Sequence, residues 1–332
     1  MRAAALASLG IAGLLLTGCT GFQSVLDAQG PSAVHLKYLI LGIIAICTAV
    51  WLAVMIVLGA ALTRRRDASV TSPPQTQRIM ALVVGGAVAV TVIIITGLTI
   101  ASYHTTRQLH AAADGDIIIK VRGHQWWWRV SYIDSDPAKT FETANEIHLP
   151  VGKNVRLQLE SADVIHSFWV PSLAGKQDLV PGRLNELVIR ADRAGVYRGQ
   201  CAEFCGTQHS HMAMLVVAED SGAFEAWAAA QRSDAKPSAT AEVNAGKSVF
   251  LGKPCSACHT VRGINTSAGT GPDLTHVGSR QTIAAGLVDN TRGSLAAWIA
   301  DPQTMKPGSN MPMVPLSSEE LRQISAYMAS LK

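Results

Sequence analysis

The sequence predicts a multidomain membrane protein, in which a two-helix transmembrane hairpin is followed by an all-β domain and then by a small all-α domain. Three observations predict this fold class. Two long apolar segments lie near the start, short alternating runs fill the middle, and a cysteine motif with helical periodicity lies near the end. The 332 residues are 48% hydrophobic and only 16% charged, which is too apolar for an ordinary soluble protein.

The first segment, Met1–Cys19, has the pattern of an export signal. One arginine precedes an apolar run that is too short to span a bilayer comfortably and that ends in small residues. The ending Leu-Thr-Gly-Cys19 resembles a bacterial lipoprotein signal, in which the cysteine becomes the lipidated first residue of the mature chain. We therefore expect a lipoprotein-like signal peptide over residues 1–18 and an exported segment over 19–34. An uncleaved signal with a chance cysteine is the alternative.

Two further apolar segments, Leu36–Leu62 and Ile79–Tyr103, are almost free of charge. Each exceeds the ~20 residues that a membrane-spanning helix needs, so we expect a transmembrane hairpin over residues 35–107. A pair of isolated spans makes a poor channel. The hairpin is therefore expected to anchor the chain in membrane lipid and to pack on a larger membrane partner.

The loop between the two spans carries Arg64, Arg65 and Arg66. With Arg78 and Arg2, and after subtraction of Asp67, these arginines account for the whole formal net charge of +4. The positive-inside rule places this loop in the cytoplasm, so the N-terminus and everything after the second span lie on the exported side of a bacterial cell membrane. No large basic face remains for a nucleic acid backbone, and we exclude nucleic acid as a partner.

The middle of the chain predicts an all-β domain over residues 114–218. Apolar and polar residues alternate over Ile117–Arg122, Val155–Glu160 and Leu187–Arg190, with turn residues between such runs. Several short strands at this spacing are typical of a Greek-key sandwich or barrel.

One late loop in this domain gathers sulfur and imidazole in Cys201, Cys205, His209 and Met212, and His166 lies upstream. Copper electron-transfer sites need thiolate, imidazole and thioether ligands together, and a mononuclear blue site uses one cysteine. This loop has one thiolate more, and two thiolates from one loop can bridge two coppers. Because the domain is exported to an oxidising compartment, a disulfide between the two cysteines is the alternative.

The C-terminal motif Cys255-Ser-Ala-Cys258-His259 has the spacing for covalent attachment of haem c. Two thioethers would fix the porphyrin and His259 would supply an axial ligand, which a simple redox pair of cysteines would not need. We expect an all-α domain over residues 241–332, with a disulfide-bearing helical domain as the alternative. Residues 219–240 are expected to be a helix followed by a flexible linker, because an alanine-rich stretch precedes small polar residues.

The constellation around Cys201 and Cys205 resembles the dinuclear CuA centre of cytochrome c oxidase subunit II, and the resemblance covers the hairpin and the whole cupredoxin-like β domain. It implies that these two cysteines are bridging thiolates. It further implies that His166 and His209 are the imidazole ligands of copper and that Met212 is the thioether ligand.

The same resemblance assigns two further positions. Glu203 matches the residue whose backbone carbonyl binds copper, and whose side chain in that family reaches a Mg or Mn ion at the boundary with the catalytic subunit. The motif Gly-His-Gln-Trp126-Trp-Trp matches an aromatic cluster and implies that electrons enter the domain at Trp126. One departure is that Thr76–Met80, at the start of the second span, lacks the carboxylate that relatives use for a proton path.

The segment from about Thr240 to Lys332 resembles a small class I cytochrome c. Met311, in a Pro-Gly-Ser-Asn-Met sequence, matches the methionine axial ligand of the haem iron, and Pro272 matches the proline that supports the histidine ligand. Met305 and Met313 are rivals for the axial role. Histidine–methionine ligation raises the haem potential, as suits an electron relay.

Other polar residues near these motifs have simpler interpretations. We expect His124, His148 and His211 not to be ligands. Asp163 and Asp178 have the character of loop caps or turn residues.

The resemblance implies subunit II of a bacterial haem–copper cytochrome c oxidase with a fused cytochrome c domain. Electrons would pass from a small cytochrome c or a quinol-oxidising complex through the haem to the copper pair. They would then pass to subunit I, where O2 is reduced to water, and subunit I and further oxidase subunits would be its partners. The main alternative is a stand-alone, membrane-anchored copper and haem protein that relays electrons or carries metal. Nitrous oxide reductase needs a histidine-rich catalytic domain, which the ten histidines of this chain do not supply.

Overall fold

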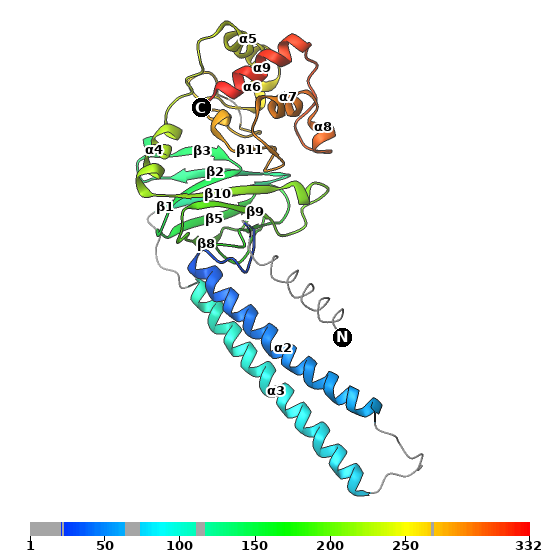
Figure 1. Cartoon of the computed structure of the whole chain (residues 1–332). Helices are drawn as coiled ribbons and strands as arrows, with labels where there is room; N and C mark the ends of the chain where they lie inside the picture. Colours follow the sequence, from blue (N-terminus) through cyan, green and yellow to red (C-terminus); the bar gives the residue numbers. More distant parts are fainter. Residues whose placement is uncertain (1–20, 22, 64–73, 111–116, 267–268) are drawn as a thin grey trace, which may run out of the picture. The chain divides into compact units, whose positions relative to one another are not determined.

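The structure is a computed structural model that describes residues 21, 23–63, 74–110, 117–266 and 269–332 (Figure 1). The predicted signal peptide with Cys19, and the arginine-rich loop between the spans, lie outside the described residues. The described chain forms two compact units. One unit holds the two long helices, and the other holds the β-sheets and the C-terminal helices.

The first unit consists of α2 (Pro31–Thr63) and α3 (Pro74–His110), which run in opposite directions (Figure 1). Each begins with a proline, whose missing N–H costs nothing at the first helical position. Both helices are long and apolar enough to cross a membrane, with mean hydropathy of 2.8 and 2.7, and none of the residues in their most apolar windows is buried. The predicted two-helix hairpin is therefore confirmed as part of the fold class.

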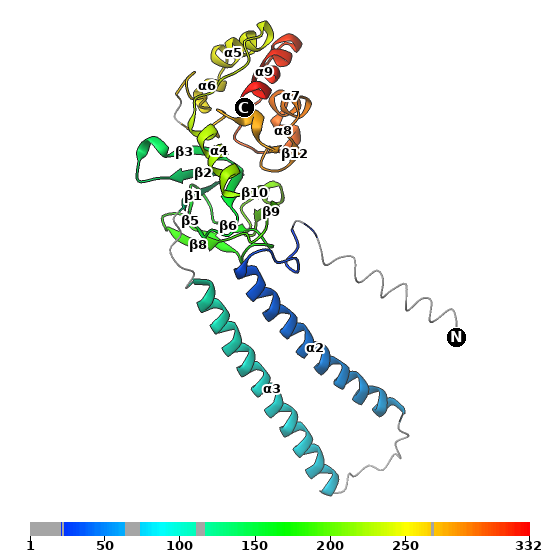
Figure 2. The same cartoon turned by 60° about the vertical axis from the view of Figure 1, so that its left-hand side comes forward.

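The β domain is a sandwich of two five-stranded sheets, seen from two sides in Figures 1 and 2. The first sheet has the order β3 (Phe141–Ala144), β2 (Trp127–Ile133), β1 (Ile117–His124), β5 (Val155–Ser161), β8 (Asn185–Ile189). The second has the order β4 (Glu146–Pro150), β10 (Ala213–Glu219), β9 (Gly195–Cys201), β6 (His166–Trp169), β7 (Gln177–Leu179). Short 3-10 turns η1 (Pro137–Lys139) and η2 (His209–His211) lie in the connections.

Most strand pairs are antiparallel, but β1 runs parallel to β5 and β4 runs parallel to β10. The predicted alternation holds, because Ile119 and Val121 of β1 are fully buried, as are Leu157 and Leu159 of β5. The inner faces of both sheets meet around Trp128. Burial of these apolar faces is the main favourable term for the sandwich.

Helix α4 (Ser221–Arg232) packs on the sandwich rather than on the domain that follows it. Phe224 and Ala228 are buried in the sandwich core, and Trp227 stacks on the ring of His148 at 4.0 Å between centroids. The side chain of Asp220 caps the helix by accepting a hydrogen bond from the N–H of Ala223.

The predicted flexible linker is shorter than the sequence indicates, because its first residues are held by the C-terminal domain. The carbonyl of Ser233 accepts a hydrogen bond from His276 Nε2 at 3.1 Å. Ala235 is buried and its N–H donates to the carbonyl of Arg262 at 3.1 Å. Lys236 to Thr240 is largely exposed. A segment of small and polar residues predicts a linker, but such a composition does not show which of its backbone groups form hydrogen bonds with a neighbouring domain.

The C-terminal domain is helical, with α5 (Ala241–Gly252), α6 (Cys255–Cys258), η3 (Val277–Ser279), α7 (Arg292–Ala300), α8 (Pro302–Met305) and α9 (Ser318–Ser330). A small ribbon of β11 (Thr282–Ile283) and β12 (Val288–Asp289) lies between η3 and α7. A capping box of Ser317 and Glu320 starts α9. The chain crosses closely at Gly246, where a Cβ would overlap the carbonyl oxygen of Gln323. The predicted all-α domain is confirmed.

Candidate metal centre

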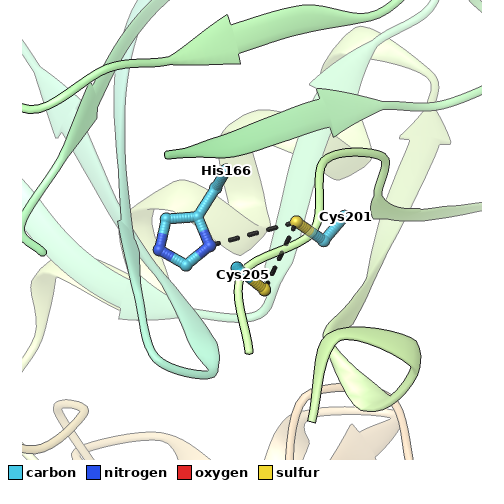
Figure 3. Close-up of side chains that lie close together, drawn as sticks. All are labelled: His166, Cys201 and Cys205. Carbon is cyan, nitrogen blue, oxygen red and sulfur yellow. Dashed lines mark hydrogen bonds between the residues drawn. The ribbon is translucent and has the colours of Figure 1, made fainter. Parts of the chain in front are cut away.

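The loop between β9 and β10 carries the predicted sulfur and imidazole residues, and strand pairing brings His166 to it. Strand β6 pairs with β9 so that Phe168 lies opposite Cys201. This register places the imidazole of His166, at the start of β6, beside the end of β9 (Figure 3). Residues 35 apart in the chain therefore face one another across the end of one sheet.

Cys201, Cys205 and His166 form the centre of the cluster, and all three are buried (Figure 3). The two sulfur atoms lie 3.8 Å apart, and His166 Nδ1 lies 3.9 Å from Cys201 Sγ. Both cysteines are free, so this structure does not contain the disulfide that was the alternative interpretation. Among the described residues, these three are the one group of histidine, cysteine and acidic side chains close enough to hold a metal ion.

The remaining predicted ligands flank this centre. His209 Nδ1 lies 3.6 Å from Cys205 Sγ, and Met212 Sδ lies 3.9 Å from the same sulfur. The carbonyl oxygen of Glu203 lies 3.2 Å from Cys201 Sγ. Each thiol therefore has one imidazole nitrogen within 4 Å and one weaker donor close to it.

These separations fit metal ions placed between the donor atoms. At a tetrahedral zinc ion, which serves here as the geometric reference, sulfur at roughly 2.3 Å and nitrogen at roughly 2.0 Å are about 3.5 Å apart, and two such sulfurs are about 3.8 Å apart. Soft thiolate and thioether donors with imidazole favour copper over Mg or Ca. The residues present therefore fit a pair of copper ions.

The two thiols cannot both ionise easily without positive charge nearby. The hydrogen-bond contact with Cys205 lowers the pKa of Cys201, against the opposing effect of burial. The same contact, with burial and the charge of Cys201, raises the pKa of Cys205. The pair therefore holds one negative charge readily, and a second becomes stable only beside cations such as bound copper.

Asp163 orients the His166 ring, a role that the sequence interpretation missed. Its carboxylate accepts a hydrogen bond from His166 Nε2 at 2.8 Å, which leaves Nδ1 turned toward Cys201. The carboxylate also accepts from the N–H groups of Gln125 and Val164, each at 2.7 Å. Burial opposes the charge on His166, but the bonds to Asp163 and Cys201 outweigh it and raise its pKa. In the sequence, the signal for this role of Asp163 was its position three residues before His166.

The backbone of β1 also sets the position of this ring. A Cβ at Gly123 would lie 2.7 Å from His166 Cδ2 and 3.0 Å from its Cγ. Such contacts are too short for any residue larger than glycine without displacement of the imidazole. Gly123 therefore leaves the space that His166 occupies.

Trp126 lies directly against the cysteine loop. It is buried, and its indole Nε1 donates a hydrogen bond to the carbonyl oxygen of Cys205 at 2.9 Å. Gln125 Nε2 donates to the same oxygen at 2.7 Å. The tryptophan is therefore linked by one hydrogen bond to a backbone group of a predicted copper ligand.

The side chain of Glu203 points away from the cluster that its carbonyl joins. It is exposed and its carboxylate lies 3.4 Å from Lys176 Nζ. Lys176 also lies 3.6 Å from the carboxylate of Asp178. A Mg or Mn ion at Glu203 stays a prediction from resemblance.

The C-terminal cysteine motif forms the short helix α6, at whose end His259 leaves the helical backbone. Cys255 and Cys258 are free and partly exposed, as covalent attachment of a porphyrin requires. His259 Nδ1 donates to the carbonyl oxygen of Pro272 at 2.8 Å, so Nε2 is the nitrogen available to an iron atom. Burial lowers the pKa of His259, which keeps the imidazole neutral as a ligand must be. These residues fit haem c.

The three candidate methionines differ in exposure. Met313 is 63% exposed, whereas Met311 and Met305 are partly buried. Gln303 Nε2 donates to the carbonyl of Met311 at 2.8 Å and to that of Ser309 at 2.9 Å, which holds the loop before Met311 in a fixed path. Met311 stays the predicted axial ligand.

The histidines that were expected not to be ligands have other partners. His148 lies between the carboxylates of Glu219 and Glu146, at 2.7 and 3.0 Å. His124 stacks on Trp127, and burial lowers its pKa to about 4. His211 Nδ1 lies 2.8 Å from the side-chain oxygen of Gln208.

Comparisons with known proteins identify two matching segments of the chain. Residues 117–219 match the family model described as cytochrome c oxidase subunit II, periplasmic domain, and residues 243–332 match the cytochrome c model. The chain is 36% identical over 334 residues to cytochrome c oxidase subunit 2 of Alkalihalophilus pseudofirmus, covering 96% of this chain and 94% of that one. It is 30% identical over 227 residues to cytochrome c oxidase subunit 2 of Bacillus sp. strain PS3, covering 65% and 62% of the two chains.

A solved structure is also similar to part of the chain. The crystal structure of the periplasmic domain of subunit II of cytochrome oxidase of Bradyrhizobium japonicum is 32% identical, with a TM-score of 0.34. The match covers 36% of this chain and 96% of that structure.

Proposed function

Because the chain belongs to the cytochrome c oxidase subunit II family, we propose that it carries electrons to the catalytic subunit of a bacterial haem–copper oxidase through its own haem c and a dinuclear copper centre. The chain is thus a subunit of an oxidoreductase complex. The periplasmic domain of cytochrome c oxidase subunit II implies copper, and a cytochrome c domain implies haem. Both matches lie in this one chain.

One observation carries the proposal. Two free, buried thiols lie 3.8 Å apart, and each has an imidazole nitrogen within 4 Å. We assign the copper pair to the following donors: His166, Cys201, Cys205, His209, Met212 and the carbonyl of Glu203. A structural disulfide would need neither the two imidazoles nor the thioether.

The haem would be held by Cys255 and Cys258 as thioethers, with His259 and Met311 as axial ligands. Both groups, when bound, would accept and release single electrons, so that electrons pass from a cytochrome c or a quinol-oxidising complex by way of haem and copper to subunit I, where O2 is reduced to water. Transfer of single electrons requires no nucleophile or acid–base pair from the chain.

Residues between the two sites support a direct path from one to the other. Trp126 donates its indole hydrogen to the carbonyl of Cys205, and its six-membered ring faces Gly308. A Cβ at Gly308 would lie 3.7 Å from Trp126 Cη2, which is ordinary van der Waals contact. Gly308 is three residues before Met311. The fused cytochrome domain therefore contacts the tryptophan at which electrons are expected to enter the copper domain.

The hairpin supports a membrane location and contact with other oxidase subunits. Helices α2 and α3 are apolar on all sides and expose large side chains such as Trp51 and Ile93. Such a surface is stable against lipid or other membrane helices. We assign the arginine-rich loop to the cytoplasm and both redox domains to the exported side. A role for Mg or Mn at Glu203 would belong to the boundary with subunit I.

Purification tests the proposal against a stand-alone relay. Affinity purification of the tagged chain from detergent-solubilised membranes should recover subunit I in equal amount, and deletion of the chain should abolish cytochrome c-dependent oxygen uptake. If the chain is recovered alone, with copper and haem bound, and oxygen uptake survives its deletion, the oxidase proposal fails.

A further inference from the structure

A buried lysine joins the cytochrome domain to the copper-binding loop. Lys306 lies just before the loop that carries Met311, and it is only 2% exposed. Lysine is almost never so deeply buried without partners. Its Nζ lies 2.7 Å from the carbonyl oxygen of Trp126, 2.7 Å from that of His211 and 3.0 Å from that of Ala284. These three acceptors match the three N–H donors of an ammonium group.

The acceptors come from both domains. Trp126 lies in the turn between β1 and β2, His211 lies in the copper-binding loop, and Ala284 lies in the β11–β12 turn of the cytochrome domain. The side chain of Lys306 therefore crosses the domain boundary and ends between two segments of the copper domain. Burial lowers its pKa to about 7, while the nearby Cys205 opposes that shift. The three carbonyls replace the water that this side chain loses.

The β11–β12 turn makes the second part of this contact. Ala284, Ala285 and Gly286 have φ of 54°, 61° and 74°, so three consecutive residues are left-handed, and two of them are not glycine. Non-glycine residues adopt this conformation uncommonly, because the Cβ crowds the following carbonyl. Such an arrangement persists where surrounding contacts hold it.

All three carbonyls of this turn accept hydrogen bonds at the domain boundary. Ala284 accepts from Lys306 at 3.0 Å, Ala285 accepts from the N–H of Ala213 at 2.9 Å, and Gly286 accepts from Arg198 Nη1 at 3.2 Å. Ala213 and Arg198 belong to β10 and β9, the strands that bracket the copper-binding loop. The unusual backbone thus turns successive carbonyls toward the copper domain.

We propose that Lys306 and the Ala284–Gly286 turn form a docking contact that holds the fused cytochrome domain on the copper-binding loop, with Lys306 as the positioning residue for electron transfer between the two domains. The role of Lys306 in electron transfer rests on the proposed function, whereas the docking contact itself does not depend on it. Gln208 adds to it, because its Nε2 donates to the carbonyl of Pro307 at 2.9 Å.

Docking at this place has a consequence for the donor. Lys306 covers the carbonyl group of Trp126, and Gly308 covers the indole ring of Trp126. A soluble cytochrome c could not reach Trp126 while the fused domain is docked. An external donor would therefore have to deliver its electron to the haem of the fused domain.

Hydrogen exchange of the intact, detergent-solubilised complex tests the contact without relying on activity. Lys306→Met removes all three hydrogen bonds and leaves buried carbonyls unpaired, so exchange in the peptide containing the Ala213 amide should speed up by about tenfold or more. Exchange in α9 should stay slow, because that helix lies in the core of the cytochrome domain. Lys236→Met, at an exposed linker position, removes the same charge and should change neither region.

Two results would overturn the proposal. Unchanged exchange at Ala213 in Lys306→Met would show that the lysine does not hold the domains together. Equal acceleration in α9 would show that Lys306 only stabilises the cytochrome domain. If Lys306→Met does not accumulate, Arg198→Ala decides, since it removes a half-exposed contact of the same turn and should give a smaller acceleration at Ala213 alone.

The functional consequence is measured separately on the same samples. After copper and haem contents and both midpoint potentials are determined, photoreduction of the haem should show slower electron transfer to copper in Lys306→Met, by about tenfold. Unchanged transfer together with faster exchange would remove the positioning role. Absence of copper or haem from the wild-type chain would instead remove the proposed function and leave the exchange result standing.

Discussion

The haem-binding and copper-binding regions differ in how the chain assembles them. The haem motif is a run of five residues, Cys255 to His259, on one short helix and its end. The copper-binding side chains come from two segments, and His166 reaches Cys201 only because β6 pairs with β9. The first site depends mainly on local spacing, whereas the second depends on the register of a sheet. Changes in the scaffold should therefore affect copper much more than haem.

The largest expected effect is that of Cys205→Ser. The hydroxyl cannot replace a bridging thiolate, so the near-infrared copper absorption should disappear or change grossly, while the haem band stays the same. Absorption spectra of the purified complex measure both. Cys47→Ser, in α2, is the matched control and should change neither band. An unchanged copper spectrum in Cys205→Ser would refute the ligand assignment.

Met311→Ala gives the complementary result for the haem. Loss of the thioether ligand should remove the methionine–iron charge-transfer band and lower the haem potential, with copper unaffected. The band and a redox titration measure this. Met313→Ala, at a position 63% exposed, should leave the band intact. If Met311→Ala keeps the band, the axial ligand has to be sought at Met305 or Met313.

Asp163→Asn tests the long-range support of the copper site. The amide weakens the hydrogen bond that orients His166, and loss of such a partner typically lowers metal affinity by about 10–100-fold. Competition of copper against a chelator measures the affinity. Asp178→Asn removes an acid that pairs with exposed Lys176 and should have no effect. Equal copper affinities in the two variants would show that Asp163 is a turn residue alone.

The smallest effect is expected from Gly123→Ala, which changes no ligand. The added methyl group would meet the His166 ring at 2.7 Å, and overpacking of this kind costs about 1–3 kcal/mol. The midpoint temperature of thermal unfolding and the copper content should both decrease, and the haem content should stay unchanged. Gly252→Ala has open space around it and should behave as the wild type. A copper content equal to that of the control would contradict the close approach of Gly123 to the His166 ring.

Much of the fold could be predicted because its signals are local. The alternation in Ile117–Arg122 and Val155–Glu160 reports one buried face of a strand, and α2 and α3 are visible as apolar segments longer than a bilayer needs. The haem motif is a contiguous spacing. The copper-binding residues could be predicted because their chemical types are rare together, although their positions relative to one another were not visible.

The remaining features depend on tertiary partners that the sequence does not name. The sequence predicts a loop cap or turn residue at Asp163, because aspartate commonly has that role in loops. Nothing in the sequence distinguishes Lys306 from an ordinary surface lysine, since most lysines are exposed. The left-handed backbone at Ala284 and Ala285 has no signal in the sequence, because alanine does not favour it. All of these positions lie where separate segments meet.

Metal and haem analysis of the intact, purified complex is the most direct test of the central claim. Quantitative elemental analysis, combined with haem c determination by its alkaline pyridine spectrum, should give a ratio of copper in this subunit to covalent haem c of two to one, after subtraction of the copper of subunit I. A preparation with full haem c and no copper bound to this chain would contradict the account.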